Sequence, residues 1–152
     1  MGELGFKVKT CTHLKSSWRI TTKTPDILIA GCGTGQHSIT TAARFKSSKV
    51  LAIDLSLSSL AYAKRKTEEL AIKNIDYMQA DILDLGQLNK QFDIIESVGV
   101  LHHMDNPMEG WKVLTDCLKP DGLMLIGLYL SLIHIWRCRR YSLCRSRWSP
   151  YH

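Results

Sequence analysis

The chain has 152 residues, of which 45% are hydrophobic and 22% are charged, and its formal net charge is +6. This size fits one domain, the composition is ordinary for a globular protein, and no apolar run is long enough to cross a bilayer, so we expect no membrane partner. The five cysteines are scattered without the spacing of a disulfide framework or a zinc site, so we expect free thiols, no metal and a cytoplasmic location.

The excess positive charge is concentrated at the C-terminal end of the chain. Five arginines lie there without a neighbouring acid, and the rest of the chain is close to neutral. A strongly basic domain would suggest a nucleic-acid partner. Because the charge belongs to the tail, we expect no nucleic-acid partner once the tail is set aside. The five residues are Arg137, Arg139, Arg140, Arg145 and Arg147.

The first 24 residues carry little pattern. Basic and hydroxyl side chains dominate, with apolar ones scattered among them. We interpret residues 1–24 as a weakly patterned N-terminal arm without a secretory signal, because they hold an early acid and no apolar core. Pro25 then introduces a core that we expect to span residues 25–129.

The core begins with the stretch Asp26-Ile-Leu-Ile-Ala-Gly-Cys-Gly-Thr-Gly35. Its apolar run, Ile27–Ala30, predicts a buried strand, and Gln36–Phe45, after the glycines, predicts a helix. Strand, glycine turn and helix are typical of the start of a nucleotide-binding βαβ unit, although a plain tight turn is the alternative. The spacing is G-x-G-x-G, and Gln36 stands where a dinucleotide fingerprint needs a small residue, which argues against a nicotinamide cofactor.

Lys49–Asp54 predicts a second buried strand, and this strand ends in an acid. A carboxylate at this distance from the glycines suits the hydroxyl groups of a ribose, because it can accept a hydrogen bond from each. The alternative is that Asp54 caps the helix that follows. We expect that helix to start at Ser56 or Ser58 and to end at Asn74.

Three more strands are predicted, at Ile75–Gln79, Phe92–Ser97 and Leu123–Tyr129. Asp84–Lys90 predicts a loop or one helical turn, and a further helix starts near Pro107. We expect the buried face of that helix to consist of Trp111, Val113, Leu114 and Leu118. A turn is expected to follow it at Lys119–Gly122.

Nearly continuous apolar strands thus alternate with helical stretches. This alternation predicts an α/β fold, a Rossmann-like, doubly wound and mostly parallel sheet of about five strands with helices on both faces.

Four motifs in this order resemble the class I S-adenosylmethionine (SAM) dependent methyltransferases. They are the glycine loop, the Asp81-Ile82 pair, the F-D-x-x-x-S-x-x-V-L-H-H stretch from Phe92, and a version of the L-K-P-G-G-x-L turn with Asp121 in place of the first glycine. The resemblance covers Asp26 to about Tyr129. It implies methyl transfer from SAM to an unidentified acceptor; the alternative is a non-catalytic SAM-binding module or an inactive fragment.

The resemblance also implies a set of site residues. Asp54 would hold the ribose, Asp81 would meet the adenine amino group, and Ile82 would pack on the adenine ring. His102 and His103 are general-base candidates, because their pKa lies in the neutral range, but they could instead only shape the loop. The implied cofactor-binding residues are Gly31, Cys32, Gly33, Gly35, Asp54, Leu55, Asp81, Ile82, Glu96 and Ser97.

Two positions near the glycines limit this interpretation. Many members of the resembling family carry an acid two residues before the first glycine, where it helps to orient SAM, and here that position is Ile29. Either another group orients the methionyl end or binding is weaker. Cys32 lies within the loop, where we expect a small side chain in a tight turn rather than a nucleophile.

Residues 130–152 are predicted to be a non-native tail. Leu130–Arg140 and Cys144–His152 each resemble the translation, in one frame, of a transposon-type sequencing adapter. The rival interpretation is an arginine-rich arm that binds RNA or an acidic membrane. With this tail, the chain lacks the last helix and the antiparallel strand pair of the resembling family. We therefore expect an open apolar edge at the fifth strand, low stability and aggregation.

Overall fold

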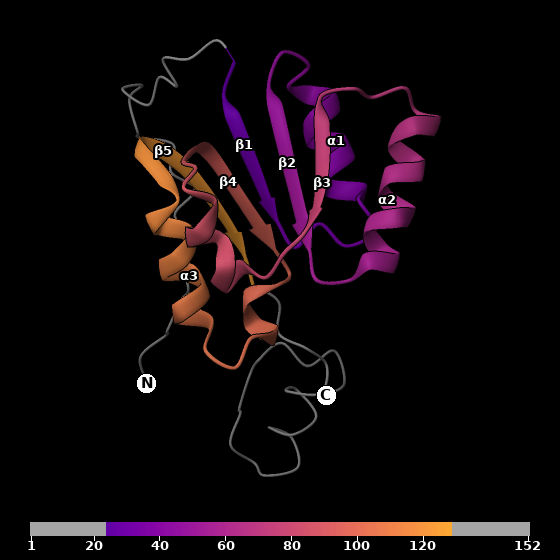
Figure 1. Cartoon of the computed structure of the whole chain (residues 1–152). Helices are drawn as coiled ribbons and strands as arrows, with labels where there is room; N and C mark the ends of the chain where they lie inside the picture. The colour runs from indigo at the N-terminus through magenta and orange to yellow at the C-terminus, as the bar shows by residue number, and fades with distance from the viewer. Residues whose placement is uncertain (1–23, 129–152) are drawn as a thin grey trace, which may run out of the picture.

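The computed structural model of the protein describes residues 24–128 (Figure 1). The predictions for residues 1–23 and for the 130–152 tail lie outside the described residues. The elements in chain order are β1 (Asp26–Ala30), α1 (Gln36–Arg44), β2 (Lys49–Asp54), α2 (Leu57–Glu69), β3 (Ile75–Gln79), the 3₁₀ helix η1 (Ile82–Leu88), β4 (Phe92–Val98), the 3₁₀ helix η2 (Leu101–His103), α3 (Pro107–Asp116) and β5 (Leu118–Gly127).

The described strands form one sheet in the order β3-β2-β1-β4-β5, and every neighbouring pair is parallel. The first strand, β1, lies in the middle of the sheet; the chain then continues outward through β2 to β3 and crosses back to β4 and β5. The winding direction reverses between β1 and β4, which is where sheets of this kind leave a crevice at the carboxyl ends of their strands. The predicted Rossmann-like, parallel fold is confirmed.

Helices cover both faces of the sheet, as expected (Figure 1). Successive side chains of a strand point to opposite faces. On β1, Ile27 and Ile29 join the apolar cluster under α1 and α2, and Leu28 joins the cluster under η1, η2 and α3. Each of these three side chains is at most 2% exposed. A strand covered on both faces needs apolar residues at every position, which explains the continuous apolar run.

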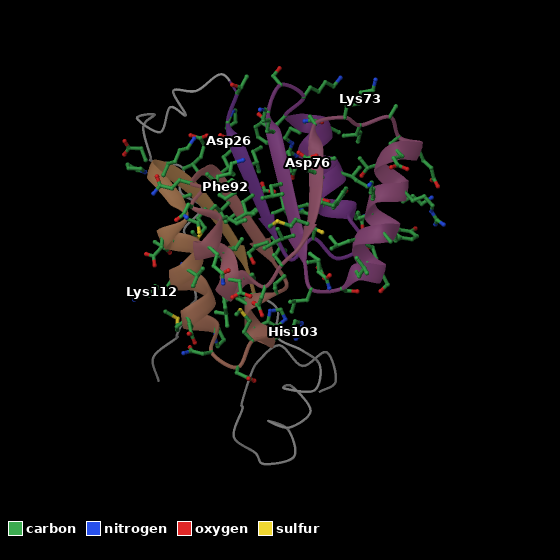
Figure 2. All side chains as sticks on the ribbon, in the orientation of Figure 1. Asp26, Lys73, Asp76, Phe92, His103 and Lys112 are labelled. Carbon is green, nitrogen blue, oxygen red and sulfur yellow. The ribbon has the colours of Figure 1, made fainter. Side chains whose placement is uncertain are left out.

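The strands all point the same way, so their two ends differ in role. Figure 2 shows Asp26, where β1 begins, near one end of the sheet, and His103, which follows β4, beyond the other end. At the amino ends, Lys119 Nζ lies 2.9 Å from Asp93 Oδ2 and 3.6 Å from Asp26 Oδ2. The carboxyl ends are where the glycine loop lies.

Three details of the sequence interpretation were wrong. The α2 helix ends at Glu69 and not at Asn74, because Ala71 takes a left-handed conformation with φ 54°. Trp111 lies on the outer face of α3 at 38% exposure, because Gly110 and Leu114, one turn apart, form the buried face. The strand β5 begins at Leu118 and not at Leu123, so Leu118, expected on the buried face of the helix, and the expected turn at Lys119–Gly122 both lie inside it, the turn as an irregularity.

The fifth strand is an edge of the described sheet. Leu123 and Leu125 are 36% and 51% exposed, which agrees with an apolar edge strand. The aggregation expected from that edge stays a prediction. Within residues 24–128, no helix combines the length and the apolar character needed to span a bilayer.

Asn74 fastens the end of α1 to the start of β2. Its Nδ2 group donates to the carbonyl oxygens of Ala42, Phe45 and Ser48 at 3.1, 3.0 and 3.1 Å. These carbonyls lie at or beyond the last turn of α1, where a helix leaves its own acceptors unsatisfied. One side-chain amide therefore binds backbone carbonyls along the whole segment that connects α1 to β2.

We expect Asn74→Ala to lower the free energy of unfolding by about 2 kcal/mol, because the three acceptors lose a shared donor in a partly buried place. The matched control is the neighbouring exposed Lys73→Ala, which should change it by less than about 0.5 kcal/mol. Urea denaturation followed by circular dichroism measures both. Equal effects of the two substitutions would contradict the role assigned to Asn74.

Candidate functional site

Two adjoining cavities lie at the carboxyl ends of the strands. Cavity A lies between the ends of β2 and β3 and the start of η1, and cavity B lies between the glycine loop, α1 and the end of β4. Their volumes are about 220 Å³ and 590 Å³, and the larger one alone is within the range typical of small-molecule sites. The two cavities share four lining residues, Gly31, Asp54, Gly99 and Val100.

The glycine loop is folded across the end of β2. The backbone N–H groups of Gly31 and Cys32 both donate to the Ile53 carbonyl at 2.9 Å. Gly31, Gly33 and Gly35 have φ values of 82°, 52° and 87°, in the left-handed region that side chains rarely adopt. The loop is therefore a fixed turn, held by the neighbouring strand.

The three glycines are needed for different reasons. A Cβ on Gly31 would lie 2.2 Å from the Val100 side chain, and one on Gly35 would lie 2.5 Å from Ala63 Cβ in α2. A Cβ on Gly33 would meet nothing within 4 Å. Gly31 and Gly35 thus serve close packing. Gly33 borders open space in cavity B, where its backbone can approach a ligand.

Asp54 joins the loop, the next helix and both cavities. Its Oδ2 accepts a hydrogen bond from the Gly33 N–H at 2.7 Å, and its Oδ1 accepts one from the Ser56 N–H at 2.9 Å. The N-cap of α2 is Ser56, whose Oγ accepts from the Ser59 N–H, so Asp54 is not the capping residue. Each carboxylate oxygen can accept a further bond, and Asp54 lines both cavities.

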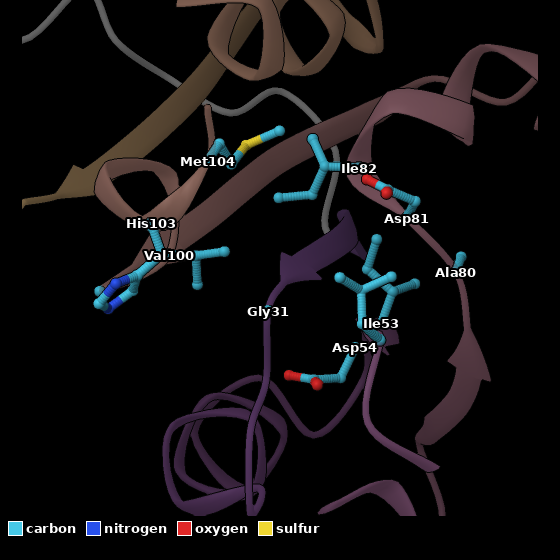
Figure 3. A pocket seen from close by; sticks show the side chains of 11 residues that line it. Gly31, Ile53, Asp54, Ala80, Asp81, Ile82, Val100, His103 and Met104 are labelled. Carbon is cyan, nitrogen blue, oxygen red and sulfur yellow. The ribbon is translucent and has the colours of Figure 1, made fainter. Parts of the chain in front are cut away.

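Asp81 has a structural bond and also faces cavity A. Its Oδ1 accepts a hydrogen bond from the Leu83 N–H at 3.0 Å, which caps η1. The same residue lines cavity A together with Ile82 and the exposed Leu55 (Figure 3). Both interpretations of Asp81, a turn residue and a ligand contact, are therefore compatible with its position.

The two predicted histidines differ in position. His103 is exposed and lines cavity A near Val100 and Met104, and Figure 3 shows these three side chains on the same side of the cavity. His102 lines neither cavity, and its ring centroid lies 4.0 Å from that of His103. The role of either histidine as a general base stays a prediction.

Glu96 and Ser97 point to opposite faces of the sheet, because they are neighbours on β4. Ser97 is 1% exposed and lines neither cavity. Glu96 Oε2 accepts a hydrogen bond from Thr41 Oγ1 at 2.9 Å and lies 2.8 Å from His37 Nε2; both partners are on α1. The sequence did not predict His37 as a site residue, although a histidine two positions after the last glycine was a visible signal.

Cys32 lines cavity B but is buried, with 6% of its surface exposed. Burial, followed by the negative charge of Asp54, raises the pKa of the Cys32 thiol to about 12. A thiol is a poor nucleophile, so the structure offers no means of activating this residue. Within residues 24–128, no three His, Cys, Asp or Glu side chains are placed to hold a metal ion.

A family model described as a methyltransferase domain matches residues 27–122, more than half of the chain. Among curated relatives, the protein syc1184_c of Synechococcus sp. is 37% identical over 109 residues, and (S)-coclaurine N-methyltransferase of Papaver somniferum is 29% identical over 100 residues. These matches cover 71% and 66% of this chain but only 26% and 28% of the relatives, so the chain spans about a quarter of their length.

A solved structure shows the same likeness. PKMT2 from Rickettsia typhi in complex with AdoHcy matches with a TM-score of 0.63 and 27% sequence identity. The match covers 68% of this chain and 21% of that one.

We expect Gly31→Ala to destabilise the protein more than Gly33→Ala. Both substitutions force a side chain into a left-handed conformation, which costs about 1–2 kcal/mol, but only Gly31→Ala adds a clash with Val100. Urea denaturation gives the two free energies of unfolding. A loss at Gly33 equal to or larger than that at Gly31 would show that the loop packs differently.

Cys32 should resist alkylation in the folded protein. A pKa raised from 9.0 to about 12 lowers the thiolate fraction by about 1000-fold. Peptide mass spectrometry after iodoacetamide treatment at about pH 8 measures the modification of Cys32. The urea-unfolded chain is the control and should react much faster. Similar rates in the two states would refute the burial of this thiol.

Proposed function

This chain belongs to the methyltransferase-domain family, and on that premise we propose that it binds S-adenosyl-L-methionine and transfers its methyl group to an acceptor. The observation that carries the proposal is the position of Asp54. One carboxylate holds the glycine loop and the start of α2, and it lines both cavities where they meet. A ligand with a central ribose and groups on either side matches this arrangement.

The residues of cavity A suit an adenosine. Asp54 would accept hydrogen bonds from the ribose hydroxyl groups, and Asp81 would accept one from the adenine amino group. Ile82 and Val100 provide apolar contacts for the adenine ring (Figure 3). The cavity is mostly apolar with a few acceptors, which is the usual composition of a site that orients a flat heterocycle.

The residues of cavity B suit the methionyl end. The open space at Gly33 leaves room for a ligand against the backbone, and Gly31 lies where the two cavities meet. Bound SAM supplies an electrophilic methyl group on a sulfonium. The contribution of this chain is to bind the cofactor in one orientation, with residues 98–100 forming the wall shared with the acceptor side.

A general base is needed only if the acceptor must lose a proton. His103 is the better placed of the two predicted candidates, because it lines cavity A and is exposed. In that role its imidazole would take the proton that the acceptor loses.

A SAM-binding module without turnover is the second candidate. The observation in its favour is Ile29, an apolar side chain 2% exposed, at the position where the resembling family often places an acid. Binding of SAM without formation of S-adenosylhomocysteine across a panel of acceptors would favour this candidate over the enzyme.

Isothermal titration of the full chain tests cofactor binding. We expect saturable SAM binding and no binding of NADH, and we expect Asp54→Asn to weaken SAM binding by about 10- to 100-fold, because a charged acceptor of two hydroxyl groups is lost. Asp76→Asn is the matched control, since Asp76 is an exposed acid on β3 that lines neither cavity.

The asparagine oxygen can still accept the Gly33 N–H, so the loop should keep this bond, although the Ser56 N–H loses its acceptor. Unchanged SAM affinity in Asp54→Asn would refute the ribose assignment. Absence of SAM binding by a folded wild-type chain would refute the proposed function itself.

A further inference from the structure

Glu96 is a carboxylate in an unusually protected place near the site. It lies on β4, one strand away from the end of β2, and its side chain is 13% exposed. Both of its close partners, the Thr41 hydroxyl that donates to it and His37 Nε2, contact the same oxygen, Oε2. Among residues 24–128, no hydrogen-bond donor is found for Oε1, and no Lys or Arg forms an ion pair with Glu96.

The neighbours of Glu96 place it directly beside cavity B. Its register partner on β1 is Ile29, and its partner on α1 is His37. Val98 follows two positions later on the same face of β4. All three of these neighbours line cavity B. Glu96 itself is not a lining residue, but its carboxylate lies next to residues that are, with Oε2 2.8 Å from His37 Nε2.

A carboxylate removed from water is costly unless hydrogen-bond donors or a cation compensate its charge. Here Thr41 donates to one oxygen, which also lies 2.8 Å from His37 Nε2, and the other oxygen has no donor within residues 24–128. The missing partner of such a group is a cation or a strong N–H donor that arrives with a ligand. SAM carries one, the α-ammonium of its methionyl end.

We infer that Glu96 binds the α-ammonium group of the cofactor in cavity B, with His37 and Thr41 as positioning residues that aim its carboxylate. The inference rests on the proposed function and deepens it. It also explains why Ile29 can stand where the resembling family often has an acid. Ile29 and Glu96 are register partners on adjacent strands, so the carboxylate of Glu96 on β4 can replace the acid that is missing from β1.

The competing explanation is that Glu96 only ties α1 to β4 through His37 and Thr41. A structural tie would affect the binding of every ligand in the site equally. An ammonium-binding carboxylate affects only ligands that carry the amino group. The two explanations therefore differ in ligand preference and not in overall affinity.

The test uses the full chain and three probes, S-adenosylhomocysteine, its analogue without the α-amino group, and adenosine. Wild type should bind S-adenosylhomocysteine at least about tenfold more tightly than the deaminated analogue, because a charge-assisted hydrogen bond is lost. Glu96→Gln should reduce that preference to about twofold or less, since the charge is gone, and should leave adenosine affinity unchanged. Asp76→Asn is the matched control, because it removes an exposed carboxylate that lines neither cavity; it should keep the preference.

A wild-type preference that persists in Glu96→Gln, or that is lost equally in Asp76→Asn, would overturn the inference, and so would an equal loss of affinity for all three probes in a folded Glu96→Gln. If circular dichroism shows that Glu96→Gln is not folded, Glu96→Asp replaces it. That variant withdraws the carboxylate by one methylene, and an unchanged preference in it would also overturn the inference. If wild type binds neither adenosine nor S-adenosylhomocysteine, the proposed function fails first, so the two failures are distinguishable.

Discussion

The attachment of the glycine loop to the end of β2 is the constraint on which the site depends. The Ile53 carbonyl receives two loop N–H groups, and the Asp54 carboxylate receives a third, from Gly33. These bonds fix where the chain turns after β1 and where α1 begins. Because Asp54 belongs at once to this attachment and to both cavities, the shape of the loop and the proposed binding of a ribose depend on one side chain. A substitution that leaves no acceptor oxygen at this position would alter both.

The parallel sheet supplies the rest of the site by bringing distant segments to one edge. Strands β1, β2 and β4 end side by side, so the residues that follow them, near positions 31, 54 and 99, enclose the same space. Side chains alternate along β4, so Glu96 contacts α1 on one face of the sheet and Ser97 is buried on the other face. Loops held on such a rigid edge can carry binding residues while the apolar strands below them carry stability.

The features that the sequence predicted well are local ones. The bounds of β2, the cap at Ser56 and the acid at the end of β2 all follow from apolar runs and short-range spacing. The pair of His37 and Glu96 joins two elements far apart in the chain, and no spacing rule connects them. Trp111 was wrongly predicted to lie on the buried face of α3, because it is apolar and adjacent in sequence to Gly110, which does lie there. The irregularity within β5 depends on strand register, which is set by tertiary pairing.

Amide hydrogen exchange of the full chain, with and without saturating S-adenosylhomocysteine, tests most directly whether these segments form one cofactor site. Added protection should appear together in residues 31–35, 54–56, 80–82 and 99–104, which line the two cavities or adjoin their lining residues. Residues 86–91, which lie at a separate cavity between η1 and α3, should exchange at an unchanged rate. Protection confined to residues 86–91, or its absence from the glycine loop at saturation, would contradict the site described above.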